Sequence, residues 1–134
     1  MIVVKEISFC CGHRLMNHEG LCRNIHGHNY RVMLMVSGGI EKRSGMVLDF
    51  KRIKEVAEER IKNVFDHALV LNCHDPLGDW FDAFDQVGGA LKIIKMDGEP
   101  TAENMAREFL HVLPEVDGIR VYETETSYAE EWRQ

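Results

Sequence analysis

The sequence predicts an α+β fold, with helices on one face of an antiparallel sheet. Two observations lead to this prediction: strand-forming segments dominate the first third of the chain, and two later segments carry apolar residues at helical spacing. The predicted order is strand, strand, strand, helix, loop, short strand, helix, strand, which fits that class. With 134 residues the chain is expected to form a single domain, residues 1–134, around one core.

Five segments are expected to be strands, because they are rich in β-branched and aromatic residues or alternate between two kinds of side chain: residues 2–9, 30–36, 46–48, 91–96 and 119–126. The sequence Ser37-Gly38-Gly39 signals a turn after the second of them. Residues 46–48 are therefore expected to return beside residues 30–36 as an antiparallel hairpin.

Two long helices are expected. Apolar residues recur at helical spacing from residue 50 to about residue 65, and Asp49 is a reasonable N-cap for that helix. The second helix is expected to follow Thr101 as its N-cap and to end at Pro114. Residues 72–89 hold several Gly, Pro and acidic residues, so they are expected to form a loop with a short helical turn around residues 80–84.

The composition favours a folded protein that acts on a small molecule. Hydrophobic residues make up 45% of the chain and charged residues 28%, as in ordinary globular domains. The formal net charge of −6 argues against a nucleic-acid partner. No apolar run approaches the roughly 20 residues that span a bilayer. Because the N-terminus is unlike a signal peptide and the four cysteines form no C-x-x-C pair, a cytoplasmic protein without disulfides is expected.

The clearest candidate for a functional site is a histidine cluster. His26 and His28 are two residues apart beside a predicted strand, so their side chains point the same way and can bind one ion. His13 follows the first strand, and strand pairing could bring it alongside that pair. Three neutral imidazoles with an open fourth position form a catalytic zinc arrangement. The alternative is a polar turn accompanied by a surface histidine.

Two cysteines lie close in sequence to these histidines. Cys11 is two residues before His13 on the same face, and as a ligand it would give a mixed sulfur and nitrogen site. Cys22 is four residues before His26, where a nearby cation would favour the thiolate, which can remove a proton. A buried and inert thiol is the alternative for Cys22.

Carboxylates supply the remaining candidates. Asp66 adjoins His67 at the end of the first predicted helix and can orient it for acid or base catalysis; the alternative is a histidine favoured there by the helix dipole. Glu123 and Glu125 share one face of the last predicted strand. An inward carboxylate there would need a partner such as the guanidine-like edge of a ligand, and the alternative is that both face water.

Six motifs along nearly the whole chain resemble the 6-pyruvoyltetrahydropterin synthase superfamily. They are Phe9-Cys-Cys-Gly-His13, Cys22-Arg-Asn-Ile-His26-Gly-His28-Asn, Leu48-Asp-Phe50, the run from Phe65-Asp-His67 to Leu71-Asn72, Pro100-Thr-Ala-Glu-Asn104 and Val121-Tyr-Glu-Thr124. The resemblance implies the tunnelling fold, in which a four-stranded antiparallel sheet carries two helices on one face. It also implies subunits that close a barrel, usually as a homohexamer of two trimers.

The same resemblance implies a role for each candidate residue. The roles are zinc ligand for His13, His26 and His28, general base for Cys22, proton relay for Asp66 and His67, and anchor of the pterin's amino-pyrimidine ring for Glu123. One departure is that Cys10 and Cys11 stand where the family usually carries small residues such as alanine. That departure leaves the mixed-ligand site open as an alternative.

The three-residue gap between Cys22 and His26 resembles the bacterial queuosine-pathway branch, 6-carboxy-5,6,7,8-tetrahydropterin synthase. The implied reaction converts 7,8-dihydroneopterin triphosphate to 6-carboxytetrahydropterin, acetaldehyde and triphosphate, with zinc as a Lewis acid. Two alternatives stay open. One is a sister enzyme on the same fold that forms a pyruvoyl product or cleaves the pterin side chain, and the other is a zinc-binding assembly protein without catalysis.

Overall fold

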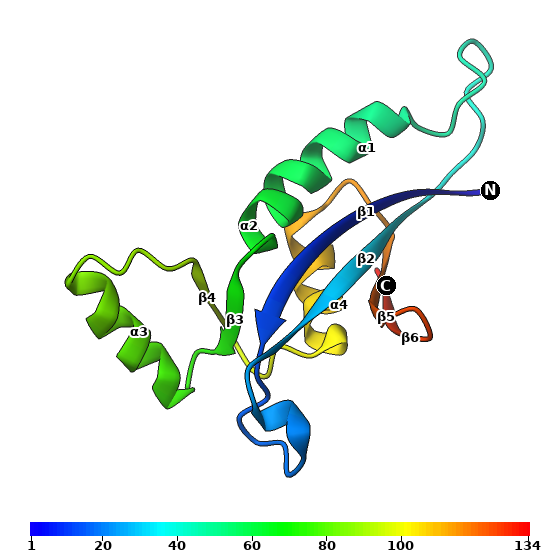
Figure 1. The fold of residues 1–134 in the computed structure, drawn as a ribbon. Helices are drawn as coiled ribbons and strands as arrows, with labels where there is room; N and C mark the ends of the chain where they lie inside the picture. Colours follow the sequence, from blue (N-terminus) through cyan, green and yellow to red (C-terminus); the bar gives the residue numbers. More distant parts are fainter.

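The computed structural model describes all residues, 1–134, and its central feature is a six-stranded sheet. In sheet order, the strands are β4 (Ile93–Met96), β3 (Leu69–Asn72), β1 (Ile2–His13), β2 (His26–Ser37), β5 (Gly118–Thr124) and β6 (Ser127–Trp132). The two longest strands, β1 and β2, run side by side through the molecule (Figure 1). Together with the helices, this sheet confirms the predicted α+β class.

The sheet is mixed, not wholly antiparallel. Strands β1, β2, β5 and β6 pair antiparallel in succession. Strand β3 adds to β1 in parallel, and β4 adds to β3 in parallel. The predicted four-stranded antiparallel sheet therefore describes only part of the structure. The two extra strands are joined through helix α3 (Pro76–Gln86), which is the kind of crossover that parallel pairing requires.

The predicted hairpin between residues 30–36 and 46–48 is wrong. Residues 46–48 form no strand and lie in the loop that leads to the first helix. The reason is that β2 already pairs with β1 along one edge and with β5 along the other. No edge of β2 is left for a returning strand, and Leu48 instead packs against the hydrophobic core.

The two long helices lie close to where the sequence predicts them. The first consists of α1 (Phe50–Ala57), a π-helical segment (Glu58–Lys62) and α2 (Asn63–Phe65), and the Asp49 side chain accepts the Lys51 amide at its start. The second is α4 (Ala102–Val112), where the Thr101 side chain accepts the Asn104 amide. No helix of the structure is long and apolar enough to span a membrane.

Helix α3 corrects the prediction of a loop over residues 72–89. Asp75 caps its first turn by accepting the Leu77 amide, and Pro76 occupies the first helical position, where its missing N–H is not needed. The helix stands apart from the rest of the molecule in Figure 1, and Trp80 is 77% exposed. Leu77, Trp80 and Phe84 do stand at helical spacing, but the Gly, Pro and acidic residues of this segment led to the prediction of a loop. A further short 3-10 helix, η1 (Leu21–Arg23), lies between β1 and β2.

The hydrophobic core lies between one face of the sheet and the two long helices. Phe9 of β1 stacks on Tyr30 of β2 at 5.5 Å between ring centroids, and Phe109 of α4 lies edge-on to Phe9 at 6.0 Å and to Phe65 at 5.0 Å. All four rings belong to one buried cluster, which contains residues from both long helices. The expectation of helices on one sheet face is confirmed. Toward the end of β1, the same inward-facing row continues to Cys11 and His13.

Candidate metal centre

His13, His26 and His28 meet where β1 ends and β2 begins. In the ladder, His13 is opposite His26 and Cys11 is opposite His28, so one sheet face carries all three imidazoles. One ring nitrogen from each lies within 4.8 Å of the other two. His13 is only 1% exposed, and the other two histidines are half-buried. The structure therefore brings together the three histidines that the sequence indicated.

Backbone carbonyl groups fix the tautomers of two of these rings. Nδ1 of His13 lies 2.7 Å from the carbonyl oxygen of Pro100, and Nδ1 of His26 lies 2.7 Å from that of Asn24. A carbonyl oxygen only accepts, so each Nδ1 carries the proton and each Nε2 presents a lone pair. The two Nε2 atoms are 3.0 Å apart, which is unfavourable unless a proton or a cation lies between them. This donor set fits a metal ion, and metal-binding histidines usually donate their other N–H in this way.

The third imidazole has a nitrogen without a partner. Nε2 of His28 is buried and makes no hydrogen bond. Oε1 of Glu123 lies 3.6 Å from this Nε2 atom, which is too far for a hydrogen bond. An unsatisfied buried nitrogen costs on the order of 1–3 kcal/mol, so this atom is expected to bind a further group. Glu123 lies beside the cluster, whereas Glu125 is exposed beyond the end of β5.

Cys11 is not one of the converging ligands. The group of donor atoms within 4.8 Å of one another contains only the three histidines. In the metal-free protein, burial, reinforced by the neighbouring Cys10 and Asp66, raises the pKa of Cys11 to about 12. The geometry favours an all-nitrogen site over the mixed sulfur and nitrogen alternative.

Cys22 and Glu123 face a common pocket. This pocket has a volume of about 320 Å³, and β6 contributes Tyr128 to its wall. Cys22 lies in η1 and is half-buried, so it is not the sealed, inert thiol of the alternative interpretation. The structure thus places the predicted base and the predicted substrate anchor at one cavity, beside the histidine cluster.

Asp66 and His67 lie elsewhere. Asp66 accepts the Cys10 amide through Oδ1 at 3.0 Å, and its Oδ2 is 3.0 Å from Nδ1 of His67. The hydrogen bond from the Cys10 amide is the main reason that the pKa of Asp66 lies below its usual range, and the contact with His67 adds to it. His67 has a positive φ of 61° and an exposed side chain. Neither residue lines the pocket of Cys22 and Glu123.

Two features of these sites were missed from the sequence. Cys10 was noted only as a departure from the family, yet its Sγ lies 3.7 Å from Oδ1 of Asp66. The alternation of inward and outward residues along residues 2–13 could have placed it on the face opposite Cys11. Strand β6 was also missed, and with it Tyr128, because the last predicted strand ends at residue 126 and includes the turn that separates β5 from β6.

A mixed sheet with two helices on one face defines a domain of the tunnelling-fold class, and its three converging histidines form a possible metal site. The sequence profile of the family 6-pyruvoyl tetrahydropterin synthase matches residues 2–134. Relatives in sequence include the 6-carboxy-5,6,7,8-tetrahydropterin synthase of Rickettsia felis, 32% identical over 94% of this chain and 96% of the relative. The enzyme of the same name from Haemophilus influenzae is 31% identical over 96% of each chain.

Solved structures share the fold. An uncharacterised protein of Wolinella succinogenes has a TM-score of 0.82 at 23% identity, covering 100% of this chain and 98% of that one. The 6-pyruvoyl tetrahydropterin synthase of Caenorhabditis elegans has a TM-score of 0.74 at 20% identity, covering 100% and 96%. The chain therefore belongs to the 6-pyruvoyl tetrahydropterin synthase family. It is an enzyme of the tetrahydropterin synthase type, as the sequence resemblance implied.

Proposed function

We propose that this protein is a zinc-dependent 6-carboxy-5,6,7,8-tetrahydropterin synthase of queuosine biosynthesis. Its substrates are 7,8-dihydroneopterin triphosphate and one water molecule, and its products are 6-carboxytetrahydropterin, acetaldehyde and triphosphate. The observation that carries the zinc assignment is the pair of Nε2 lone pairs of His13 and His26, which face each other at 3.0 Å. The names of the Rickettsia felis and Haemophilus influenzae relatives support the choice of product.

The histidine cluster and the neighbouring pocket each supply residues with a distinct role in the proposed reaction. His13, His26 and His28 would hold the zinc ion, which would act as a Lewis acid and ease deprotonation of the substrate's side-chain hydroxyls. The carboxylate of Glu123 accepts N–H bonds from the amino-pyrimidine ring and so fixes the substrate's orientation. The thiolate of Cys22, on the wall of the same pocket, takes a proton from the substrate's side chain.

The proposed proton relay of Asp66 and His67 depends on assembly. These two residues contact Cys10 and not Cys22, so a relay that serves Cys22 requires the pair from a second copy of the chain. A homohexamer of two trimers supplies that copy. Strands β4 and β6 form the two edges of the sheet, and barrel closure would pair such edges. The four free cysteines fit a reducing compartment, so we place the enzyme in the cytoplasm.

The test is to incubate zinc-loaded protein with 7,8-dihydroneopterin triphosphate and to identify the pterin product by mass spectrometry. We expect 6-carboxytetrahydropterin together with acetaldehyde. A pyruvoyl product would show that the protein is the sister enzyme that forms pyruvoyltetrahydropterin. Absence of turnover by the zinc-loaded oligomer would favour the zinc-binding assembly protein without catalysis. Cys22→Ala should abolish turnover, whereas Cys73→Ala, at an exposed thiol, is the matched control and should retain it. Equal turnover by both variants would rule out Cys22 as the base.

A further inference from the structure

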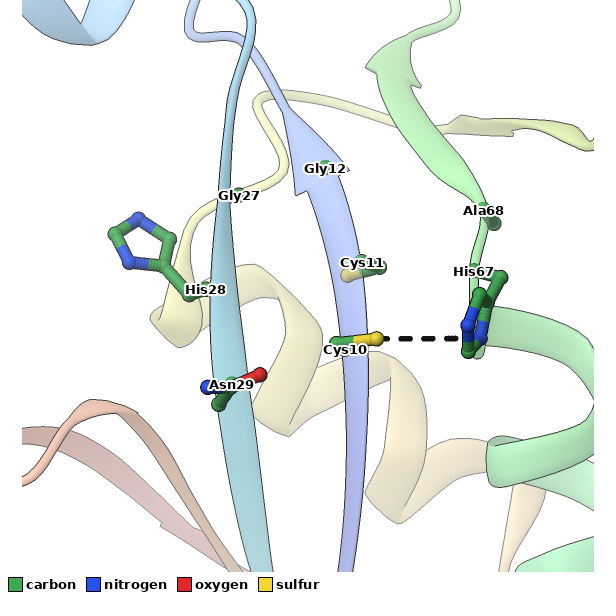
Figure 2. A pocket seen from close by; sticks show the side chains of 8 residues that line it. All are labelled: Cys10, Cys11, Gly12, Gly27, His28, Asn29, His67 and Ala68. Atoms are coloured by element: carbon green, nitrogen blue, oxygen red, sulfur yellow. Dashed lines mark hydrogen bonds between the residues drawn. The ribbon is translucent and has the colours of Figure 1, made fainter.

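A second group of metal-binding side chains lies outside the three-histidine cluster. The donor atoms of Cys10, Asp66 and His67 lie within 4.8 Å of one another. Sγ of Cys10 is 3.7 Å from Oδ1 of Asp66 and 3.9 Å from Nδ1 of His67, and that nitrogen is 3.0 Å from Oδ2 of Asp66. Figure 2 shows Cys10 and His67 directed toward each other across an open pocket of about 370 Å³, while His28 points away from them.

The geometry is not that of a nucleophile, base and orienting acid. In such a triad, the two nitrogens of the imidazole contact the nucleophile and the acid separately. Here the same atom, Nδ1 of His67, faces both the thiol of Cys10 and the carboxylate of Asp66. A proton relay needs one imidazole nitrogen at the thiol and the other at the carboxylate, so Nδ1 alone cannot relay a proton between Cys10 and Asp66. Three donor atoms that converge on one point are instead the arrangement of metal ligands.

The separations between the donor atoms are close to those around a tetrahedral zinc ion. With Zn–S near 2.3 Å and Zn–N or Zn–O near 2.0–2.2 Å, tetrahedral angles place the donor atoms about 3.3–3.6 Å apart. The observed separations are 3.7 Å from Sγ to Oδ1, 3.9 Å from Sγ to Nδ1 and 3.0 Å from Nδ1 to Oδ2, so they involve both carboxylate oxygens of Asp66. Each lies within about 0.3 Å of that range. We propose that Cys10, Asp66 and His67 form a second binding site for zinc or a similar divalent transition metal. The open pocket beside them leaves room for water as the fourth ligand.

The backbone holds these ligands in place. The Cys10 amide donates to Oδ1 of Asp66 at 3.0 Å, and the His67 amide donates to the carbonyl of Cys10 at 2.7 Å. The Gly12 amide donates to the carbonyl of Ala68 at 2.8 Å. These bonds on both sides of His67 fix it in its left-handed conformation, with φ of 61°. The backbone positions of the ligands are therefore set before a metal binds, which favours affinity.

A metal at this site would regulate the enzyme. Binding displaces the Cys10 thiol proton to solvent and occupies Nδ1 of His67, so the imidazole can no longer exchange a proton through that atom. This consequence rests on the proposed relay role of His67, whereas the binding itself does not. Zinc in excess of the three-histidine centre is then inhibitory, and a chelator that strips only the weaker site restores turnover.

Cobalt(II) distinguishes the two sites, because only the second contains sulfur. Metal-free protein is titrated with cobalt, bound metal is counted, and the sulfur-to-cobalt charge-transfer absorption in the near ultraviolet is recorded. We expect two ions per chain and a charge-transfer band in the wild type and in the control Cys73→Ser, whose thiol is exposed. Cys10→Ser should lose the band and bind the second ion more than about 100-fold more weakly, since loss of even an orienting group costs 10–100-fold.

His67→Ala provides a second variant that should fold normally, because the His67 side chain is 78% exposed. It should also lose the second ion. A wild type that binds a single cobalt ion, or a band of full intensity in Cys10→Ser, would overturn the proposal. Inhibition is compared within each variant as the ratio of turnover with and without excess zinc, and Cys10→Ser should lose the inhibition seen in Cys73→Ser.

The outcomes distinguish the two proposals. One cobalt ion with intact pterin turnover would refute only the second site, whereas two ions without turnover would refute only the proposed function.

Discussion

His13 and His26 lie directly opposite each other in the β1–β2 ladder, and their Nε2 atoms are 3.0 Å apart. The candidate metal centre is therefore built by strand register. A slip of one residue between β1 and β2 would turn an imidazole to the other face of the sheet. The twelve paired positions of this ladder, from Ile2 opposite Ser37 to His13 opposite His26, make such a slip costly. Extended strand pairing thus positions ligands that are distant along the chain.

Gly27 lies between two of the ligands, and substituting it should disturb the centre. A Cβ at this position would lie 3.2 Å from the carbonyl oxygen of Cys11, a backbone atom that cannot move without shifting β1. Gly27→Ala should reduce zinc affinity and lower the free energy of unfolding by about 1–3 kcal/mol. A competition titration with a zinc chelator measures the first effect, and urea unfolding measures the second.

The matched control for that substitution is Gly39→Ala. No heavy atom lies within 4 Å of the position that its Cβ would take, so both zinc affinity and stability should match the wild type. If Gly27→Ala bound zinc as tightly as Gly39→Ala, the close approach of β1 and β2 would not determine the geometry of the centre.

The sequence predicts well those features that depend on local spacing. The shared facing of His26 and His28 follows from the two-residue period of a strand, and the N-caps at Asp49 and Thr101 follow from side-chain chemistry. The placement of His13 needed one further assumption, that its strand pairs with theirs. Since β1 and β2 are consecutive strands, that assumption was a favourable one.

Features that depend on competition between distant segments were not predictable. Residues 46–48 have the composition of a strand, but β5 takes the edge of β2 that they would need. The neighbourhood of Cys10 and His67 spans 57 residues and depends on the parallel pairing of β1 with β3. Helix α3 was missed for a different reason, because the Gly, Pro and acidic residues of the segment favoured a loop although Leu77, Trp80 and Phe84 stand at helical spacing.

The burial of His13 makes the metal-free protein sensitive to acid. Desolvation lowers the pKa of His13 below 6.5, although the hydrogen bond to the Pro100 carbonyl opposes this shift. As pH falls through 6.5, the unfolded chain binds a proton at His13 before the folded protein does. The free energy of unfolding should therefore decrease, and the decrease should end below the folded pKa. A ring-nitrogen NMR titration gives the pKa directly, and a value at or above 6.5 would contradict this explanation.

Phe109 should contribute strongly to stability, because it is fully buried between Phe9 and Phe65. Phe109→Ala removes both aromatic contacts and leaves a cavity, which should lower the free energy of unfolding by about 3–5 kcal/mol. Urea unfolding at fixed protein and zinc concentrations measures the change. As a control, Trp80→Ala on the exposed side of α3 should change stability by no more than about 0.5 kcal/mol. Similar losses from both variants would mean that α3 is packed against something in solution.

The lowered pKa of Asp66 should persist when its histidine neighbour is removed. The largest single cause is the hydrogen bond from the Cys10 amide, and His67 adds a hydrogen bond and a charge interaction. His67→Ala in metal-free protein should therefore raise the pKa of Asp66 but leave it below its ordinary value, as followed by carbon-detected NMR of its carboxyl group. His111→Ala, at an exposed histidine on α4, should leave it unchanged. Since the folded pKa is depressed, the stabilisation is present above the ordinary pKa of 3.8 and is lost as pH falls through the folded value. A return to 3.8 in His67→Ala would show that the imidazole, and not the backbone amide, holds the carboxylate in its charged form.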